Sequence, residues 1–129
     1  MDRATHPPAI LVVDDDRSTL LFLTHYLGWL APAYDILPVG DAQSALRHLA
    51  ERTVLLLITD YRLPGMNGLQ LTTMVKALSP ETYVILTSAD DSAQLKQWAH
   101  DHQVDTILYK LDLMAQLEDV VRRALPIDG

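Results

Sequence analysis

The sequence predicts an α/β protein with one parallel, five-stranded sheet and helices on both of its faces. The hydrophobic pattern alternates five times between a short apolar run and a longer stretch with apolar residues three or four positions apart. Strands that alternate with helices pair in parallel, because each helix returns the chain to the edge where the next strand begins. Three of the apolar runs are almost continuously aliphatic, which is typical of central strands buried on both faces.

The first two strand–helix pairs lie in the N-terminal half of the chain. The run "AILVVD" (9–14) precedes a helix expected over 17–30, and "YDILPV" (34–39) precedes one expected over 42–51. Their apolar faces are Leu20, Leu23, Leu27 and Leu30, and then Ala42, Ala45, Leu46 and Leu49. Pro38 has no N–H to give to a neighbouring strand, so the second strand is expected at an edge of the sheet.

The third and fourth pairs contain the longest apolar runs. "VLLLITD" (54–60) precedes a helix expected over 68–78, and "TYVILTS" (82–88) precedes one expected over 91–102. The apolar faces of these helices are Leu69, Leu71, Met74, Val75 and Leu78, and then Leu95, Trp98 and Ala99.

The fifth pair completes the pattern. "DTILYK" (105–110) precedes a helix expected over 113–125, which the proline of "PIDG" ends. The apolar face of this helix is Leu113, Leu117, Val120, Val121 and Leu125.

The composition indicates one globular domain. The chain has 129 residues, of which 49% are hydrophobic and 21% are charged. The start "MDRATHPPA" lacks the apolar core of a signal peptide, so a disordered tail is expected over 1–8. The domain is expected over 9–125, and 126–129 would be a tail or the start of a linker.

Charge and cysteine content narrow the function classes. A formal net charge of −7 argues against direct nucleic-acid binding, which needs clustered Lys and Arg. No apolar run approaches the ~20 residues that cross a membrane. The chain has no cysteine, which excludes disulfides and thiolate metal sites and fits a cytoplasmic protein.

Polar side chains stand at the carboxyl ends of four of the five expected strands. They are Asp14 and Asp15 after the first strand, Asp60 at the third, Thr87 and Ser88 at the fourth, and Lys110 at the fifth. Ligands of doubly wound sheets bind beyond these strand ends. The carboxylates suit Mg²⁺, and the lysine and hydroxyl suit the oxygens of a phosphoryl group. The sequence therefore predicts a site for a divalent cation and a phosphoryl group at this edge.

Four segments carry a family resemblance: "VVDDD" (12–16), "TDYRLPGMNGLQL" (59–71), "ILTSADD" (85–91) and "YK" (109–110). With them the chain resembles a receiver domain of two-component response regulators, the type found in chemotaxis regulators, over residues 9–125. The resemblance implies the flavodoxin-like strand order 2-1-3-4-5.

The resemblance assigns roles to the residues at the strand ends. Asp60 would be the phosphoacceptor, a carboxylate nucleophile that forms an acyl phosphate. Mg²⁺ would be held by Asp60, by Asp15 directly, by Asp14 directly or through water, and by the backbone carbonyl of Arg62. Thr87 would hydrogen-bond the phosphoryl group and move toward it.

Lys110 would pair first with Asp60 and then with the phosphate. Pro64, Gly65 and Gly68 would shape the loop after the acceptor strand.

The resemblance also implies partners. The donor would be a phosphohistidine on a sensor histidine kinase or phosphotransfer protein. A homodimer could form through the fourth helix, fifth strand and fifth helix. The chain would catalyse only its own phosphorylation and dephosphorylation, and otherwise would not be an enzyme.

Three positions depart from the family pattern. Leu111 follows the lysine where proline is usual, so the bend there lacks the easier cis bond of proline. Ile107 replaces an aromatic residue that rotates inward on activation, and Gln103 replaces a glycine that ends the fourth helix.

Other interpretations stay open at this point. Ser88 is a second candidate for the phosphate hydroxyl, although strand alternation favours Thr87. Asp16 is expected to be a solvated acid or the N-cap of the first helix, and Asp41 is expected to be a helix N-cap. The three departures allow an unphosphorylated pseudo-receiver that acts as a protein-binding or dimerisation module. A Mg²⁺-dependent phosphatase is disfavoured, because "DYR" offers no second acid two residues after Asp60.

Overall fold

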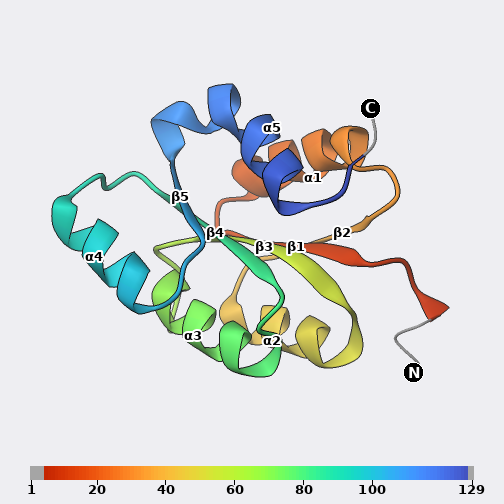
Figure 1. The fold of residues 1–129 in the computed structure, drawn as a ribbon, viewed down its shortest axis with the longest axis horizontal. Coiled ribbons are helices and arrows are strands. Elements are labelled where there is room, and N and C mark those ends of the chain that lie inside the picture. Colours follow the sequence, from red (N-terminus) through yellow and green to blue (C-terminus); the bar gives the residue numbers. More distant parts are fainter. Residues whose placement is uncertain (1–4, 128–129) are drawn as a thin grey trace.

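The computed structural model describes residues 5–127, and within them five parallel strands form one sheet in the order β2-β1-β3-β4-β5 (Figure 1). The strands are β1 (Ala9–Val13), β2 (Asp35–Val39), β3 (Val54–Asp60), β4 (Tyr83–Ser88) and β5 (Thr106–Tyr109). The helices are α1 (Arg17–Leu30), α2 (Ala42–Glu51), α3 (Gly68–Leu78), α4 (Ala93–Asp101) and α5 (Leu113–Ala124). The fold class and the strand order predicted from the sequence are confirmed.

The strand and helix bounds differ from the expected ones by only one or two residues. β5 ends at Tyr109, and Lys110 begins a short 3₁₀ turn, η2 (Lys110–Asp112), rather than ending the strand. α4 begins at Ala93 because the Ser92 hydroxyl accepts a hydrogen bond from the Leu95 N–H and caps the helix there. Pro38 lies exposed on the edge strand β2, as its missing N–H predicted.

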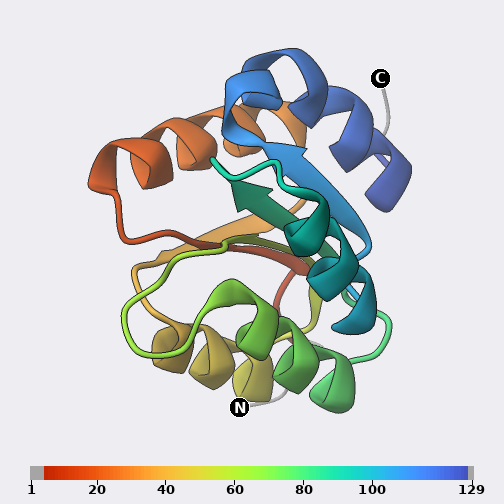
Figure 2. The same cartoon turned by 90° about the vertical axis from the view of Figure 1, so that its left-hand side faces the viewer.

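Two helical layers cover the sheet (Figures 1 and 2). α1 and α5 lie on one face and pack against alternate residues of the central strands, among them Ile10, Val12 and Ile58. α2 and α3 cover the opposite face, where Leu11 and Leu57 point. α4 lies beyond α3, near β4 and β5, over a smaller apolar cluster that contains Leu69, Leu86, Leu95 and Ala99.

At the edge of the sheet opposite the site, hydrogen bonds and an ion pair connect the start of β2 with Pro7, Pro8 and Arg52. The Asp35 N–H donates to the Pro8 carbonyl at 3.1 Å, and the Arg52 guanidinium donates to the Pro7 carbonyl at 3.0 Å. Arg52 also forms an ion pair with Asp35 at 2.6 Å. Of the two expected tails, residues 1–4 and 128–129 lie outside the described residues.

Among the described residues, no helix is both long enough and apolar enough to span a bilayer.

Candidate functional site

Two neighbouring strands bring three carboxylates together at one edge of the sheet. β1 pairs with β3 so that Val13 lies opposite Thr59, and the next residues, Asp14 and Asp60, therefore end up side by side. With Asp15 they place one carboxylate oxygen each within 4.8 Å of one another. Asp14 is only 1% exposed and Asp60 only 7%, whereas Asp15 is open to solvent.

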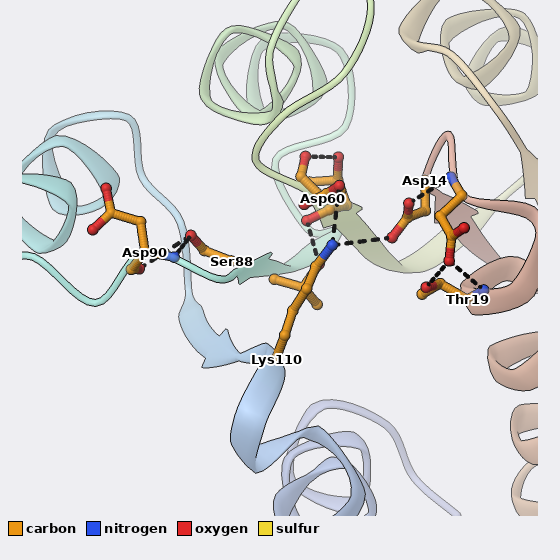
Figure 3. Close-up of polar contacts among 9 residues, drawn as sticks. Asp14, Thr19, Asp60, Ser88, Asp90 and Lys110 are labelled. Carbon is orange, nitrogen blue, oxygen red and sulfur yellow. Dashed lines mark hydrogen bonds and ion pairs between the residues drawn. The ribbon is translucent and has the colours of Figure 1, made fainter.

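Lys110 reaches this cluster from the end of β5. Its Nζ lies 3.2 Å from Asp60 Oδ2 and 3.8 Å from Asp14 Oδ2 (Figure 3). The turn η2 turns the chain away from the sheet directly after Tyr109, and the long side chain extends back toward β1 and β3. One ammonium facing three carboxylates leaves an excess of two negative charges.

The electrostatics of Asp14 suit a cation. Burial is the main cause that raises the pKa of Asp14, and the charge of Asp60 raises it further. The hydrogen bond that the Asp16 N–H donates to Asp14 Oδ1 at 2.9 Å opposes this rise, as does Lys110. In the described part of the chain, the buried Asp14 Oδ2 has no hydrogen-bond partner. A buried, unsatisfied carboxylate oxygen beside two further carboxylates fits the hard oxygen ligand set of Mg²⁺.

Thr87 and Ser88 differ in what their hydroxyls contact. Thr87 is 3% exposed and lies opposite Asp60 in the register of β3 and β4, so the two side chains share a face of the sheet. Its hydroxyl donates a long hydrogen bond of 3.4 Å to the Thr59 carbonyl. The Ser88 hydroxyl accepts from the Asp90 N–H at 2.9 Å and donates to the Asp90 carbonyl at 3.1 Å (Figure 3). Ser88 therefore shapes the loop after β4, and Thr87 is the hydroxyl beside Asp60.

Arg62 follows the end of β3 by two residues. Its exposed guanidinium lies 5.6 Å from the centre of the Tyr61 ring. The role of its backbone carbonyl as a main-chain metal ligand stays a prediction.

Gly68 has a role at the site that the sequence did not reveal. A Cβ at this position would lie 2.3 Å from the Asp60 carbonyl oxygen and 2.8 Å from Leu86 Cδ1. The Gly68 N–H also donates to the Tyr61 carbonyl at 2.8 Å. The first turn of α3 thus packs directly on the backbone that carries Asp60. The sequence predicts that Gly68 shapes the loop. It does not show the close approach of Gly68 to Asp60 and Leu86, because these residues meet it only in the folded protein.

The structure shows the local surroundings of the three residues that depart from the family pattern. Gln103 adopts a φ of +68°, so the left-handed position after α4 exists and a non-glycine residue fills it. Ile107 packs against the apolar cluster under α4. Leu111 is 100% exposed beside Lys110, and the described chain contains no cis peptide bond. The Lys96 ammonium lies 6.0 Å from the centre of the half-buried Tyr109 ring.

Both helix caps expected next to the site are confirmed. The Asp16 carboxylate accepts from the Thr19 N–H at 3.0 Å and from the Thr19 hydroxyl at 2.6 Å at the start of α1. The Asp41 carboxylate accepts from the Ser44 N–H at 2.7 Å at the start of α2. Of three consecutive acids, Asp16 therefore belongs to a helix and Asp14 and Asp15 to the cluster.

Known proteins resemble this chain over most of its length. The family profile described as the response regulator receiver domain matches residues 10–122. The chain is 33% identical over 125 residues to the transcriptional regulatory protein AruR of Pseudomonas aeruginosa, covering 90% of this chain and 50% of AruR. It is 30% identical over 135 residues to the cyclic di-GMP phosphodiesterase response regulator RpfG of Xanthomonas campestris, covering 92% of this chain and 36% of RpfG.

Solved structures give the same result. The signal receiver domain of an HD domain-containing protein from Pseudomonas fluorescens superposes with a TM-score of 0.83 at 31% identity, covering 98% of this chain and 90% of that one. The chemotaxis response regulator CheY4 of Vibrio cholerae shares the fold, with a TM-score of 0.81 at 21% identity over 92% of this chain and 99% of CheY4. The chain spans about half or less of the length of these two curated relatives. From its fold, its strand-end cluster and these matches, the chain belongs to the receiver domain family of two-component response regulators.

Proposed function

We propose that this chain is a phosphoaccepting receiver in which Asp60 takes a phosphoryl group and the domain surface changes in response. The observation that carries the proposal is the ion pair between Lys110 and Asp60 over a cluster of three carboxylates. A lone solvated strand end would need neither the convergent lysine nor the buried, unsatisfied oxygen of Asp14.

Asp14, Asp15, Asp60 and the carbonyl of Arg62 would hold Mg²⁺. When bound, the ion would neutralise the excess negative charge of the carboxylates and of the incoming phosphoryl oxygens. Asp14 Oδ2, which has no hydrogen-bond partner among the described residues, and the exposed Asp15 carboxylate have lone pairs to offer to it.

The chemical step follows from the placement of Asp60. A carboxylate oxygen of Asp60 attacks phosphorus, and the bond between phosphorus and the donor's imidazole nitrogen breaks. The electron pair of that bond leaves with the imidazole, which then takes a proton from water. Lys110 lies 3.2 Å from the acceptor carboxylate and can stay on the oxygens of the transferred group.

Thr87 would respond to the added charge by forming a new hydrogen bond. A phosphoryl group brings roughly −2 of charge and three acceptor oxygens beside a buried hydroxyl whose present hydrogen bond is 3.4 Å long. A hydroxyl held this weakly can exchange the Thr59 carbonyl for a phosphoryl oxygen. The loop after β4, which follows Ser88, would move with it.

Partners and location belong to the same proposal, and membership of the family supports them. The donor would be a histidine kinase or a phosphotransfer protein, in the cytoplasm, and the output would be delivered by another domain or protein. Relatives carry names as different as a transcriptional regulatory protein and a cyclic di-GMP phosphodiesterase response regulator. Direct nucleic-acid binding by this acidic domain is not expected. A homodimer through α4, β5 and α5, and a domain boundary at residues 9 and 125, also belong to this proposal.

Amide NMR with beryllofluoride, a phosphoryl mimic, tests the proposal. Beryllofluoride with Mg²⁺ should shift the amides of Asp60 and of Thr87 in wild type. Asp60→Asn should remove both shifts, because the acceptor oxygen is lost. Lys110→Ala should keep a shift at Asp60 and reduce the one at Thr87, because the coupling between the two is weakened. If beryllofluoride with Mg²⁺ shifts neither amide in wild type, the chain is a pseudo-receiver that acts without phosphorylation.

A further inference from the structure

Tyr61 lies between the acceptor strand and the apolar cluster that α4 covers. It directly follows Asp60, and its half-buried ring points to the opposite face of the sheet, as the alternation of side chains requires. On that face the ring packs against the cluster formed by Leu69, Leu86, Leu95 and Ala99. Leu95 and Ala99 are the two buried residues of α4. One residue therefore adjoins the acceptor through its backbone and the floor of α4 through its ring.

The backbone of Tyr61 is hydrogen-bonded to two elements that surround the acceptor. Its N–H donates to the Thr87 carbonyl at 2.9 Å, and its carbonyl accepts from the Gly68 N–H at 2.8 Å. Under the proposed function, Thr87 is the residue that moves toward a phosphoryl group on Asp60. A movement of Thr87 therefore acts on a hydrogen bond of Tyr61 with no residue in between.

The ring of Tyr61 has room to move. The guanidinium of Arg62 lies 5.6 Å from the ring centre, and a cation–π contact at an exposed side chain is weak. The ring also lines an open hollow of about 330 Å³ between the start of α3 and α4, together with Asn67, Leu69, Gln70, Trp98 and His102. The Trp98 side chain of α4 borders this hollow and is 40% exposed. The hollow offers the ring a second position, beside Trp98.

The attachment of α4 to the sheet is light. α4 is the shortest of the five described helices, with nine residues, and it buries only Leu95 and Ala99. An element with few buried apolar side chains has a low local stability and shifts easily. A change in the cluster beneath α4 is therefore enough to move the helix.

Ile107 packs against the same cluster from β5, but its position is less suited to this role. β4 separates β5 from the acceptor strand β3. Ile107 is also β-branched, so rotation about its first side-chain bond is restricted. Tyr61 is next to the acceptor, is bonded to Thr87, and carries a ring with space beside it.

We propose that Tyr61 transmits the phosphoryl state of Asp60 to α4. When Thr87 moves toward the phosphoryl group, the ring of Tyr61 leaves its contact with Arg62 and enters the hollow beside Trp98. The cluster under α4 then repacks, and the helix shifts. This inference rests on the proposed function, because the phosphoryl group on Asp60 is its trigger.

Amide NMR with beryllofluoride and Mg²⁺ separates loading of the site from the response of α4. In wild type, the amides of Asp60, Leu95 and Ala99 should all shift. Tyr61→Leu should keep the shift of Asp60 and lose most of the shift of the two α4 amides, because leucine fills the cluster without a ring. Tyr61→Phe keeps the ring and should respond like wild type. Ile107→Val changes the same cluster from β5 and should also respond like wild type.

Trp98 gives a second readout that needs no change at Tyr61. Trp29→Phe leaves Trp98 as the single tryptophan, and Trp29 is 72% exposed, so the fold should tolerate its replacement. In this variant, beryllofluoride with Mg²⁺ should reduce the quenching of Trp98 fluorescence by acrylamide, because the ring of Tyr61 covers the indole. Adding Tyr61→Leu should remove this protection.

The outcomes distinguish this inference from the proposed function. If the Asp60 amide of wild type does not shift, both are overturned. If Asp60 shifts but the α4 amides respond equally in wild type and Tyr61→Leu, only the role of Tyr61 is overturned. The same holds if the α4 response is lost in Ile107→Val, or if acrylamide quenching of Trp98 stays equal or rises while the Asp60 amide shifts.

Discussion

At the scale of single residues, backbone positions decide how closely the acceptor strand is held. Gly68 packs its α-carbon against the Asp60 carbonyl, where any side chain would collide with backbone. Gln103 is a non-glycine residue in a left-handed conformation, which glycine adopts at little cost. Position 68 therefore requires a glycine, whereas position 103 would favour a glycine but does not have one.

We expect Gly68→Ala to destabilise the fold by about 1–3 kcal/mol, as overpacking does. The added methyl group would meet the Asp60 carbonyl at 2.3 Å, so α3 or the end of β3 must shift. Urea denaturation measures the loss. Gly28→Ala is the matched control. Its added methyl group would have no atom within 4 Å, so this change should raise the free energy of unfolding. Equal effects at the two positions would contradict the contact.

We expect Gln103→Gly to stabilise the protein by about 0.5–1 kcal/mol, because the left-handed conformation costs a residue with a Cβ more than the added flexibility of glycine. The φ of +68° is the observation behind this expectation. Thermal unfolding measures the change. Gln97→Gly within α4 is the control and should lower stability, since its backbone is helical.

At the scale of elements, α1, α2, α3 and α4 each start from a side-chain cap, whereas α5 does not, and these caps fix where the loops after the first four strands end. The Ser44 N–H donates to the Asp41 carboxylate at the start of α2, and the Asn67 amide and Gln70 form a reciprocal capping box at the start of α3. These short polar signals were readable from the sequence at Asp16 and Asp41.

The cap of α2 should give stability a defined pH dependence. The hydrogen bond from the Ser44 N–H is the main cause that lowers the pKa of Asp41 below its ordinary value of 3.8. The stabilisation is therefore complete above 3.8 and is lost as the pH falls through the lower value of the folded state. Wild type should exceed Asp41→Asn in unfolding free energy near neutral pH, and the gap should close in acid. A gap that is constant with pH would contradict the charged cap, and Asp119→Asn serves as the control.

At the scale of the whole molecule, most of the architecture could be predicted from the hydrophobic pattern. Near-continuous aliphatic runs such as 54–60 can only be buried strands in a chain of this kind, and the polar residues at their ends meet because parallel strands end at one edge. The strand order came from the family resemblance. The pattern could not show the contact of Gly68 with Asp60, nor the hydrogen bond from the Thr87 hydroxyl to the Thr59 carbonyl, because both depend on how separate elements pack against each other. The hydrogen bonds of Ser88 are local, since their partner Asp90 is only two residues away.

The carboxylate cluster should also make the stability of the whole domain depend on Mg²⁺. Binding to the folded state alone adds about 2.7 kcal/mol at a concentration one hundred times the dissociation constant. Asp15→Asn should reduce this gain, because it removes an exposed ligand of the cluster. Asp16→Asn is the matched control: the neighbouring acid caps α1, asparagine keeps the cap, and the gain should remain. Thermal shift with and without Mg²⁺ compares the three proteins.

The most direct test of the central claim is intact-mass spectrometry after incubation with Mg²⁺ and a small acyl phosphate, or with a competent phosphorylated kinase. Wild type should gain the mass of a single phosphoryl group, and the gain should disappear in Asp60→Asn and when Mg²⁺ is chelated. The Asp41→Asn variant, which changes a carboxylate outside the cluster, should gain the same mass as wild type. A wild type that gains no mass with any of these donors, or an equal gain in Asp60→Asn, would contradict the assignment of Asp60 as the phosphoacceptor.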